Sequence, residues 1–253
     1  MIRGERLNNM AAYVNEQQYV SVDDLVNKFN ISKATVRRDL DILNEKGVIC
    51  LFRGGAGGIQ QVEKELLYDE KLNSNREEKR RIGQYASSVI KEGQTIFVDT
   101  GVTTGEMIPF LLEQKDIHIV TNDVWIVANL ASNMDIKVSV PGGDVRRGFY
   151  TICGSETEQF LSNLYVDIAF ISIDAIDDKF GCSITNNDEV LIKQQMIAHS
   201  KKTIMLADHS KFQSVASWKT CKIEDIDMYV TGSEISKEIL MQYQKYNIVM
   251  HIV

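Results

Sequence analysis

Residues 20–56 read VSVDDLVNKFNISKATVRRDLDILNEKGVICLFRGGA, and apolar side chains recur in this stretch at the spacing of a helix. The same spacing occurs in the residues just before it. The three apolar sets are Leu7, Met10, Ala11 and Val14; then Leu25, Val26 and Phe29; then Val36, Leu40 and Leu43. This periodicity predicts three short amphipathic helices within the first 46 residues.

The residues that flank these helices indicate where two of them begin and which element comes after the third. Ser21, with Asp24 three residues later, has the pattern of a capping box for the second helix, and Ser32 is suited to cap the third. Residues 47–53 are predicted to form a short strand, and the glycine-rich residues 54–58 to be flexible punctuation. The expected order is therefore three helices and then a wing-like hairpin.

The third helix carries basic residues on the side that faces away from its apolar residues. The residues on this outward face are Lys33, Thr35, Arg37 and Arg38. In a major groove, arginine can bind guanine edges or phosphates, and a threonine methyl group can contact thymine. A solvated basic face would have the same composition, but the three-helix order, the two caps and the wing favour DNA binding.

Composition is that of a globular protein and assigns any DNA-binding part to the N-terminal end. Hydrophobic residues make up 44% and charged residues 25% of the 253 residues, and no apolar run reaches the roughly 18 residues of a membrane span. The net charge is −7, yet residues 1–60 carry +1 and the remainder carries −8. We therefore expect contact with the phosphates of DNA through the first 60 residues, and no membrane partner.

Three further features indicate the cellular compartment and whether a metal is bound: the first residues, the cysteines and the histidines. The opening MIRGERLNNM lacks the apolar core of an export signal, so we expect a cytoplasmic protein. The four cysteines lie far apart without a C-x-x-C pair, and the four histidines show no ligand spacing. We therefore expect reduced thiols, no metal site and no cofactor.

Changes in composition divide the rest of the chain. Residues 59–82 are polar and charged, so we interpret them as a connector, partly helical, between a domain of residues 1–58 and one of residues 83–253. The larger part alternates helical segments with apolar runs at 95–98, 118–121, 137–140, 167–173, 203–207, 228–231 and 248–253. Such runs are typical of strands buried on both faces, as in an α/β domain with a mainly parallel sheet. Its ligand is expected beyond the carboxyl ends of the strands.

The first of these strand ends is rich in glycine and threonine. Residues 99–105 read DTGVTTG and lead into a helix expected over residues 106–112. Free N–H groups, hydroxyls and the positive end of a helix dipole would make this loop an anion site suited to phosphate. A plain turn with a threonine cap explains the loop equally well. The polar or small residues after other strands favour a ligand site; they are Thr121, Asn122, Gly142, Gly143 and residues 208–211.

The run quoted first resembles the winged helix-turn-helix of the DeoR family of bacterial transcription regulators, which joins an S-x-x-T-[VI]-R-R-D-L recognition helix to a G-G-A wing end. The matching residues are Ser32, Thr35, Val36, Arg37, Arg38, Asp39, Leu40, Gly47, Gly54, Gly55 and Ala56. The resemblance implies that Asp39 and Leu40 are structural. The DNA contacts that it implies are Ser32, Lys33, Thr35, Arg37, Arg38 and, in the wing, Arg53.

The larger part resembles the sugar-phosphate sensor of the same family, which is similar in fold to ribose-5-phosphate isomerase. The stretches that carry this resemblance are GQTIFVDTGVTT, VTND, PGGDVRR, residues 167–173, NDEVLIKQQMI and LADHSKF. The pocket residues that it implies are Asp99, Gly101, Thr103, Thr104, Thr121, Asn122, Glu189, Lys193, Asp208 and Lys211. Lys193 and Lys211 would supply charge to an anionic ligand.

The chain departs from the family pattern at a few positions. Val102 replaces a hydroxyl residue, and Ser172 and Ala175 replace glycines in what we expect to be a loop near the ligand. Either the effector differs or the pocket is partly degraded. In the connector, Lys71 stands where the family commonly has arginine, and Lys79 matches.

Three function classes come into question for this sequence. A protein-interaction module, in which the helix-turn-helix serves packing, is disfavoured by the outward basic pair and the wing. Carboxylates at strand ends, such as Asp99, Asp174, Glu189 or Asp208, could move a proton in a phosphosugar isomerase, which is the alternative. Such carboxylates more often bind sugar hydroxyls or cap helices, so we expect no enzyme. We expect instead a homo-oligomeric regulator, dimer or tetramer, that represses carbohydrate-metabolism genes. Its expected partners are a double-stranded DNA operator and a phosphorylated sugar or polyol.

Overall fold

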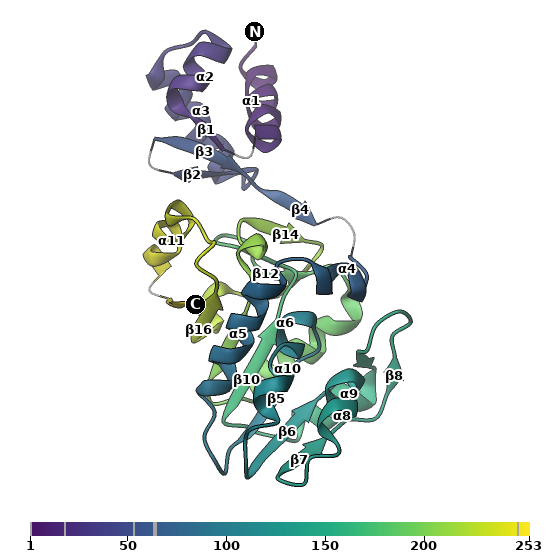
Figure 1. The fold of residues 1–253 in the computed structure, drawn as a ribbon. Coiled ribbons are helices and arrows are strands. Elements are labelled where there is room, and N and C mark those ends of the chain that lie inside the picture. Colours follow the sequence, from purple (N-terminus) through teal and green to yellow (C-terminus); the bar gives the residue numbers. More distant parts are fainter. Residues whose placement is uncertain (1, 18, 53, 63–64, 247) are drawn as a thin grey trace.

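The computed structural model describes residues 2–17, 19–52, 54–62, 65–246 and 248–253. A small N-terminal domain of helices and a three-stranded sheet is joined through a strand to a larger domain with a seven-stranded sheet (Figure 1). None of the described helices is both long enough and apolar enough to cross a lipid bilayer.

The three helices predicted for the N-terminal domain are confirmed, together with their caps. The elements are α1 (Arg3–Gln17), β1 (Tyr19–Ser21), α2 (Val22–Phe29), α3 (Lys33–Glu45), β2 (Ile49–Phe52) and β3 (Gly55–Gly58). The Ser21 hydroxyl accepts from the N–H of Asp24, whose carboxylate accepts from the N–H of Ser21. Ser32 Oγ accepts from the N–H of Thr35 and so caps α3. The predicted apolar sets pack into one core with residues of β2 and β3.

The glycine-rich segment differs from its prediction. Residues 55–58, expected to be flexible punctuation, form β3, the central strand of the sheet β1-β3-β2. A Cβ atom on Gly55 would lie 2.4 Å from the backbone oxygen of Val20, and one on Gly58 would lie 2.8 Å from the Cα atom of Asn15. These glycines therefore allow α1 and β1 to approach the backbone of β3 closely, and do not serve flexibility.

Replacing Gly55 with alanine is expected to lower the free energy of unfolding by about 1–3 kcal/mol, because backbone atoms of β1 would have to move aside for the added methyl group. Gly4 is the matched control, since a Cβ atom there would meet nothing within 4 Å. Gly4→Ala is expected to leave stability unchanged or to raise it slightly. Thermal unfolding followed by circular dichroism would compare the two, and equal stability would show that β1 yields without cost.

The seven predicted strands of the larger domain are confirmed and form one parallel sheet in the order β17-β16-β13-β10-β5-β6-β7. They are β5 (Thr95–Val98), β6 (Ile117–Thr121), β7 (Ile136–Ser139), β10 (Ile168–Ser172), β13 (Thr203–Leu206), β16 (Met228–Thr231) and β17 (Val249–Ile252). Neighbouring residues of a strand enter different cores: Ile96 packs on one face of the sheet and Phe97 on the other. This two-sided burial explains the continuous apolar runs.

Helices cover both faces of the sheet (Figure 1). Residues of α5 (Arg76–Ser88), α7 (Ile108–Leu111) and α8 (Val124–Leu130) pack in one core. Residues of α9 (Ser155–Ser162), α10 (Val190–Ala198) and α11 (Lys237–Tyr243) pack in the other. The larger domain therefore has three layers, helices, sheet and helices, as an α/β class requires.

The helix expected over residues 106–112 is wrong in its bounds. The structure has α6 (Val102–Gly105) directly after Gly101, and then α7. Pro109 is the second residue of α7 and has no N–H group to donate to the carbonyl oxygen four residues earlier, which disfavours one continuous helix through this position. Residues 102–105, which were expected to be part of a loop, form the short helix α6.

Shorter elements complete the chain. They are β4 (Gln60–Val62), α4 (Tyr68–Asn73), β8 (Asp144–Val145), β9 (Ile152–Cys153), β11 (Ala175–Asp177), β12 (Gly181–Ile184), η1 (Asn187–Glu189), η2 (His209–Lys211), β14 (Ser214–Ala216), β15 (Trp218–Cys221), η3 (Ile223–Asp225) and η4 (Gln244–Tyr246). In the predicted connector, β4 pairs in parallel with β14, and α5 continues across residue 82. Lys179 Nζ also donates to the side-chain and backbone oxygens of Asn44, at the end of α3.

Candidate functional site

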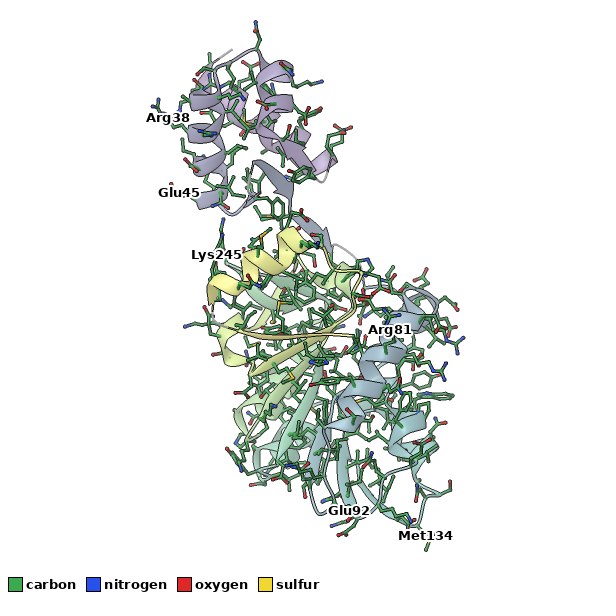
Figure 2. The ribbon with its side chains drawn as sticks, turned by 60° about the vertical axis from the view of Figure 1, so that its left-hand side comes forward. Arg38, Glu45, Arg81, Glu92, Met134 and Lys245 are labelled. Carbon is green, nitrogen blue, oxygen red and sulfur yellow. The ribbon has the colours of Figure 1, made fainter. Side chains whose placement is uncertain are left out.

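The helix α3 presents its two arginines to solvent. Val36, Leu40 and Leu43 are buried in the N-terminal core, so helical periodicity places Arg37 and Arg38 on the outer surface. In Figure 2, Arg38 projects from the side of the small domain, clear of the larger one. Within the described part of the chain, neither guanidinium group has a hydrogen bond or an ion pair. Both are therefore available to bind phosphates or base edges.

The other predicted DNA contacts differ in their surroundings. Ser32 Oγ lies 2.9 Å from Thr35 Oγ1 in addition to capping α3, so both hydroxyls are engaged within the helix. Lys33 Nζ lies 2.6 Å from the carboxylate of Asp23, but both side chains are exposed, and such pairs open at little cost. Arg53 lies outside the described residues. DNA contact by these residues stays a prediction.

Asp39 is structural, as expected. It is 1% exposed, and Arg6 donates to its two carboxylate oxygens from Nε at 2.7 Å and from Nη2 at 3.2 Å. This two-point ion pair joins α1 to α3 and fixes the direction of the outward face. No pattern in the sequence marks Arg6, because its partner lies on another helix, 33 residues away.

A cavity, partly open to solvent, lies at the carboxyl end of the parallel sheet. Residues that follow β5, β10 and β13 line it, together with residues of η1, α10, α4 and α5. Its charged lining residues are Glu65, Lys71, Lys79, Asp174, Glu189, Lys193 and Lys211. The place is the one that a doubly covered parallel sheet predicts for a ligand.

The structure brings half of the predicted effector residues into the cavity wall. These are Gly101, Thr103, Glu189, Lys193 and Lys211. The other half lies behind the wall, in hydrogen bonds that hold the surrounding loops: Asp99, Thr104, Thr121, Asn122 and Asp208. Gly142 and Gly143 belong to neither group, since they pack against Thr157 and Cys153.

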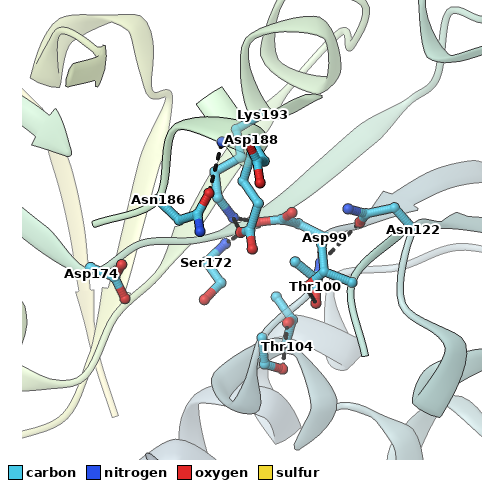
Figure 3. Close-up of polar contacts among 12 residues, drawn as sticks. Asp99, Thr100, Thr104, Asn122, Ser172, Asp174, Asn186, Asp188 and Lys193 are labelled. Carbon is cyan, nitrogen blue, oxygen red and sulfur yellow. Dashed lines mark hydrogen bonds and ion pairs between the residues drawn. The ribbon is translucent and has the colours of Figure 1, made fainter. Parts of the chain in front are cut away.

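Lys193 and Asp99 form a buried ion pair beside the cavity (Figure 3). Lys193 Nζ lies 2.5 Å from Asp99 Oδ2 and 3.6 Å from the carboxylate of Glu189. Burial would lower the pKa of Lys193, but the two carboxylates outweigh it and raise that pKa. Burial raises the pKa of Asp99 to about 6, still below neutral pH. At neutral pH both groups are therefore charged and balance each other.

Hydrogen bonds tie the ends of three neighbouring strands around residues 99–101 (Figure 3). Asp99 Oδ2 also accepts from the N–H of Ser172 at 3.0 Å. The N–H of Thr100 donates to Asn122 Oδ1 at 3.1 Å, and the Thr100 hydroxyl donates to Asp123 at 2.8 Å. The side chain of Asn122 therefore positions the loop that forms the wall.

The three departures from the family pattern have different consequences. Val102 and Ser172 line the cavity, so at these two positions its wall differs from the one that the family pattern implies. Gly101 has a φ of +148°, and a Cβ atom there would lie 2.4 Å from Ser172 Oγ, so this position requires glycine. Ser172 is the last residue of β10, and Ala175 is buried in β11 and pairs with β12, so the expectation that these two residues lie in a loop is wrong.

The connector supplies part of the cavity. Lys71 Nζ donates to Asp174 at 3.0 Å, and Lys79 Nζ donates to two backbone oxygens and lies 3.9 Å from Asp208. Burial would raise the pKa of Asp174, but Lys71 and the N–H of Thr185 outweigh it and lower that pKa. In the sequence, the only indication of this contribution was the comparison of Lys71 and Lys79 with the family pattern. Neither lysine was among the predicted site residues.

Three aromatic residues of the cavity wall were missed. Tyr68 of α4 packs edge-to-face on Tyr150, with ring centroids 4.8 Å apart, and Phe149 precedes Tyr150 in the wall. No periodicity or motif marks them in the sequence, because they come from a connector and from a loop. Together they add aromatic surface to a cavity wall that also carries charged groups.

Lys211 differs from the other lysines of the cavity. Lys71, Lys79 and Lys193 each have a carboxylate oxygen within 4 Å. Lys211 has no ion pair and no side-chain hydrogen bond among the residues that the structure describes. It ends η2, which Asp208 caps by accepting from the N–H of Ser210. Its ammonium group is therefore available to an anion from outside the protein.

A group with possible metal ligands lies nearby. One atom each of Glu78, Asp208 and His209 falls within 4.8 Å of the others. The carboxylate of Glu78 already accepts from the N–H groups of His209 and Gly232 at 2.7 and 3.1 Å, and lies 2.6 Å from His209 Nδ1. We interpret the group as a link between α5 and η2.

Two family models match the chain. Residues 6–62 match the DeoR-like helix-turn-helix domain, and residues 74–233 match the DeoR C terminal sensor domain. The two matches correspond to the N-terminal domain with the arginine face and to most of the domain with the cavity.

Relatives extend over nearly the whole chain. It is 31% identical to the HTH-type transcriptional regulator GlpR of Haloferax volcanii over 94% of this chain and 93% of that protein. It is 30% identical to the glycerol-3-phosphate regulon repressor of Escherichia coli over 92% of each. A ribose 5-phosphate isomerase A structure from Methanocaldococcus jannaschii is similar over 55% of each chain, with 17% identity and a TM-score of 0.41. The family models and relatives are regulators and not enzymes, which sets the isomerase alternative aside. The chain belongs to the DeoR family of DNA-binding transcription regulators.

Proposed function

We propose that this regulator represses carbohydrate-metabolism genes and that a phosphorylated sugar or polyol in the cavity releases it from its operator. The observation that carries the proposal is the Lys211 ammonium group, which lines a polar cavity and has no ion pair among the described residues, although Asp208 and Asp174 interact with it at longer range. A phosphate group in the cavity would accept a direct charge-assisted hydrogen bond from it. The pairing of the other lysines makes Lys211 the first residue to test.

The rest of the cavity wall suits the sugar part of such a ligand. The carboxylates of Asp174 and Glu189 can accept hydrogen bonds from sugar hydroxyls, and Thr103 can donate one. The rings of Tyr68 and Tyr150 can cover the less polar face of the carbon chain. The name of the Escherichia coli relative refers to a phosphorylated polyol, glycerol 3-phosphate, which supports this class of effector.

On the DNA side, α3 would lie in the major groove, with Arg37 and Arg38 toward bases or phosphates. We propose a homo-oligomer, dimer or tetramer, that acts in the cytoplasm. Its two-fold symmetry would place two α3 helices in successive major grooves of a double-stranded operator. The operator is therefore expected to be pseudo-palindromic or repeated.

The route from the cavity to the DNA-binding domain is short. Lys211 is three residues from the first residue of β14, and β14 pairs with β4, which follows the wing strand β3. A ligand that shifts η2 would act on this pairing. The ligand is an inducer only if it binds the DNA-incompetent arrangement more tightly than the DNA-competent one.

Fluorescence anisotropy with DNA from upstream of the protein's own gene tests the proposal. Operator binding is measured over a salt series, with and without a panel of sugar phosphates. Binding that weakens with salt and is released by one phosphate ester supports the proposal. A complex that no member of the panel releases contradicts the effector part.

Replacing Lys211 with alanine is expected to weaken the release of operator DNA by the active sugar phosphate by about tenfold or more, because one charge-assisted contact is lost. Operator affinity without effector should stay as in the wild type. Lys201→Ala, which removes an exposed lysine of the same domain, is the control and should respond normally. A normal effector response by Lys211→Ala would exclude this residue from the phosphate site.

A further inference from the structure

We propose that Glu65 is an internal anion that competes with an anionic effector for Arg146 and Lys71, so that filling the cavity releases the segment leading to the DNA-binding domain. The inference rests on the proposed function, and it assigns the regulation of that same cavity to one carboxylate.

Glu65, a residue of the cavity wall, makes a two-point contact with Arg146. Its two carboxylate oxygens accept from Arg146 Nη2 at 2.6 Å and from Nη1 at 3.4 Å. One of these oxygens also lies 3.6 Å from Lys71 Nζ. Glu65 lines the cavity, whereas Arg146 is only 10% exposed. Glu65 therefore joins the cavity to a guanidinium group that is not among the residues lining it.

Both cations would remain paired if Glu65 moved away. Arg146 Nη1 also donates to Glu189, and Lys71 Nζ donates to Asp174 at 3.0 Å. Moving Glu65 would therefore leave no buried cation without a carboxylate, unlike the breaking of an isolated buried pair. A phosphate group has the oxygen geometry to take the two-point contact of a carboxylate with arginine. The position of Glu65 is thus one that an anion from solvent can fill.

Glu65 differs from the other carboxylates of the cavity in the part of the chain to which it belongs. Asp174 follows β10, and Glu189 precedes α10, so both belong to the body of the α/β domain. Glu65 follows Val62, the last residue of β4, by three residues, and β4 begins two residues after the wing strand β3 ends. Glu65 is therefore the cavity carboxylate nearest in sequence to the strand that joins the two domains.

The pairing of β4 with β14 is the element on which a displacement of Glu65 would act. The two strands pair in parallel over only three residues each, Gln60–Val62 with Ser214–Ala216. So short a ladder is stabilised by few hydrogen bonds and is marginal by itself. The ion pair of Glu65 with Arg146 lies three residues beyond it in the sequence and is a further attachment of the same segment to the larger domain. Its loss would loosen the attachment of the N-terminal domain.

The test compares the full-length wild type with Glu65→Gln and, as a control, Glu77→Gln, which neutralises an exposed carboxylate of α5. Isothermal titration calorimetry with inorganic phosphate measures anion binding. Hydrogen exchange at the backbone amides of β4 and β14 measures the pairing of these strands. Glutamine keeps the size of the side chain, so the change removes chiefly the charge.

Glu65→Gln is expected to bind phosphate about fivefold more tightly or better, because the internal competitor is weakened. Its β4 and β14 amides should exchange faster than in the wild type, as those of the wild type should when phosphate is added. Glu77→Gln should behave as the wild type in both measurements. A carboxylate that only held the segment in place would, when neutralised, change exchange without raising phosphate affinity.

Equal or weaker phosphate binding by Glu65→Gln overturns the inference, and so does tighter binding with unchanged exchange. The proposed function fails in a different way, when no sugar phosphate releases the operator from the wild type. A wild type that a sugar phosphate releases, beside a Glu65→Gln variant without tighter phosphate binding, would reject the role of Glu65 alone.

Discussion

Replacing Lys193 with alanine is expected to lower the free energy of unfolding of the larger domain by about 3–5 kcal/mol, because the change leaves the carboxylate of Asp99 buried without a cation. Asp99 is fully buried, and its Oδ1 atom has no hydrogen-bond partner among the described residues even in the presence of Lys193. The two tryptophans, Trp125 and Trp218, lie in this domain. Urea unfolding followed by tryptophan fluorescence therefore measures the effect.

The double variant Lys193→Met with Asp99→Asn is the matched control. Removing both charges should recover about half or more of the lost free energy, since neither a cation nor a carboxylate then stays buried alone. Wild-type stability in Lys193→Ala would show that water or another group reaches Asp99. A poor effector response by Lys193→Ala would not place Lys193 in contact with the ligand, because the variant also loses the support of the Asp99 loop.

Replacing Arg38 with alanine is expected to weaken operator binding by about tenfold to a hundredfold, the range for the loss of one arginine contact to a base edge. If Arg38 instead contacts a phosphate, the loss should be smaller, and the slope of log affinity against log salt should fall by about one. Arg38 is exposed and has no partner among the described residues, so the fold and the effector response should be unaffected. Fluorescence anisotropy over a salt series measures both quantities.

Arg80→Ala serves as the control for Arg38→Ala, because Arg80 is an exposed arginine on α5 of the larger domain. The two variants have the same net charge and differ only in where the charge is removed. Equal operator affinity in both would remove Arg38 from the DNA interface and leave Arg37 as the arginine of α3 to examine.

Local features of the fold could be predicted from the sequence with good accuracy. The helices of the N-terminal domain, the capping box of Ser21 and the seven strands could all be inferred from the spacing of apolar residues and from single cap residues. These features depend on contacts between residues three or four positions apart, or on whether one face or two faces of a segment are buried. The prediction of a flexible segment at the glycines of β3 was wrong, because glycine occurs both in turns and where backbones pack closely. The helix expected over residues 106–112 took no account of Pro109, which lies in the first turn of the shorter helix α7.

The composition of the cavity depended on the tertiary structure. The pair of Asp99 with Lys193 joins residues 94 positions apart, and that of Glu65 with Arg146 joins residues 81 positions apart. The sequence by itself determined which strand ends carry polar groups and which helix face is basic, because these are properties of each segment. The tertiary structure decided which polar groups line the cavity and which only support it. Two features were decisive: the order of strands in the sheet, and the position of α4 and α5 at the carboxyl edge of that sheet. That order depends on the packing of whole surfaces against one another, and the spacing of residues along the chain does not contain it.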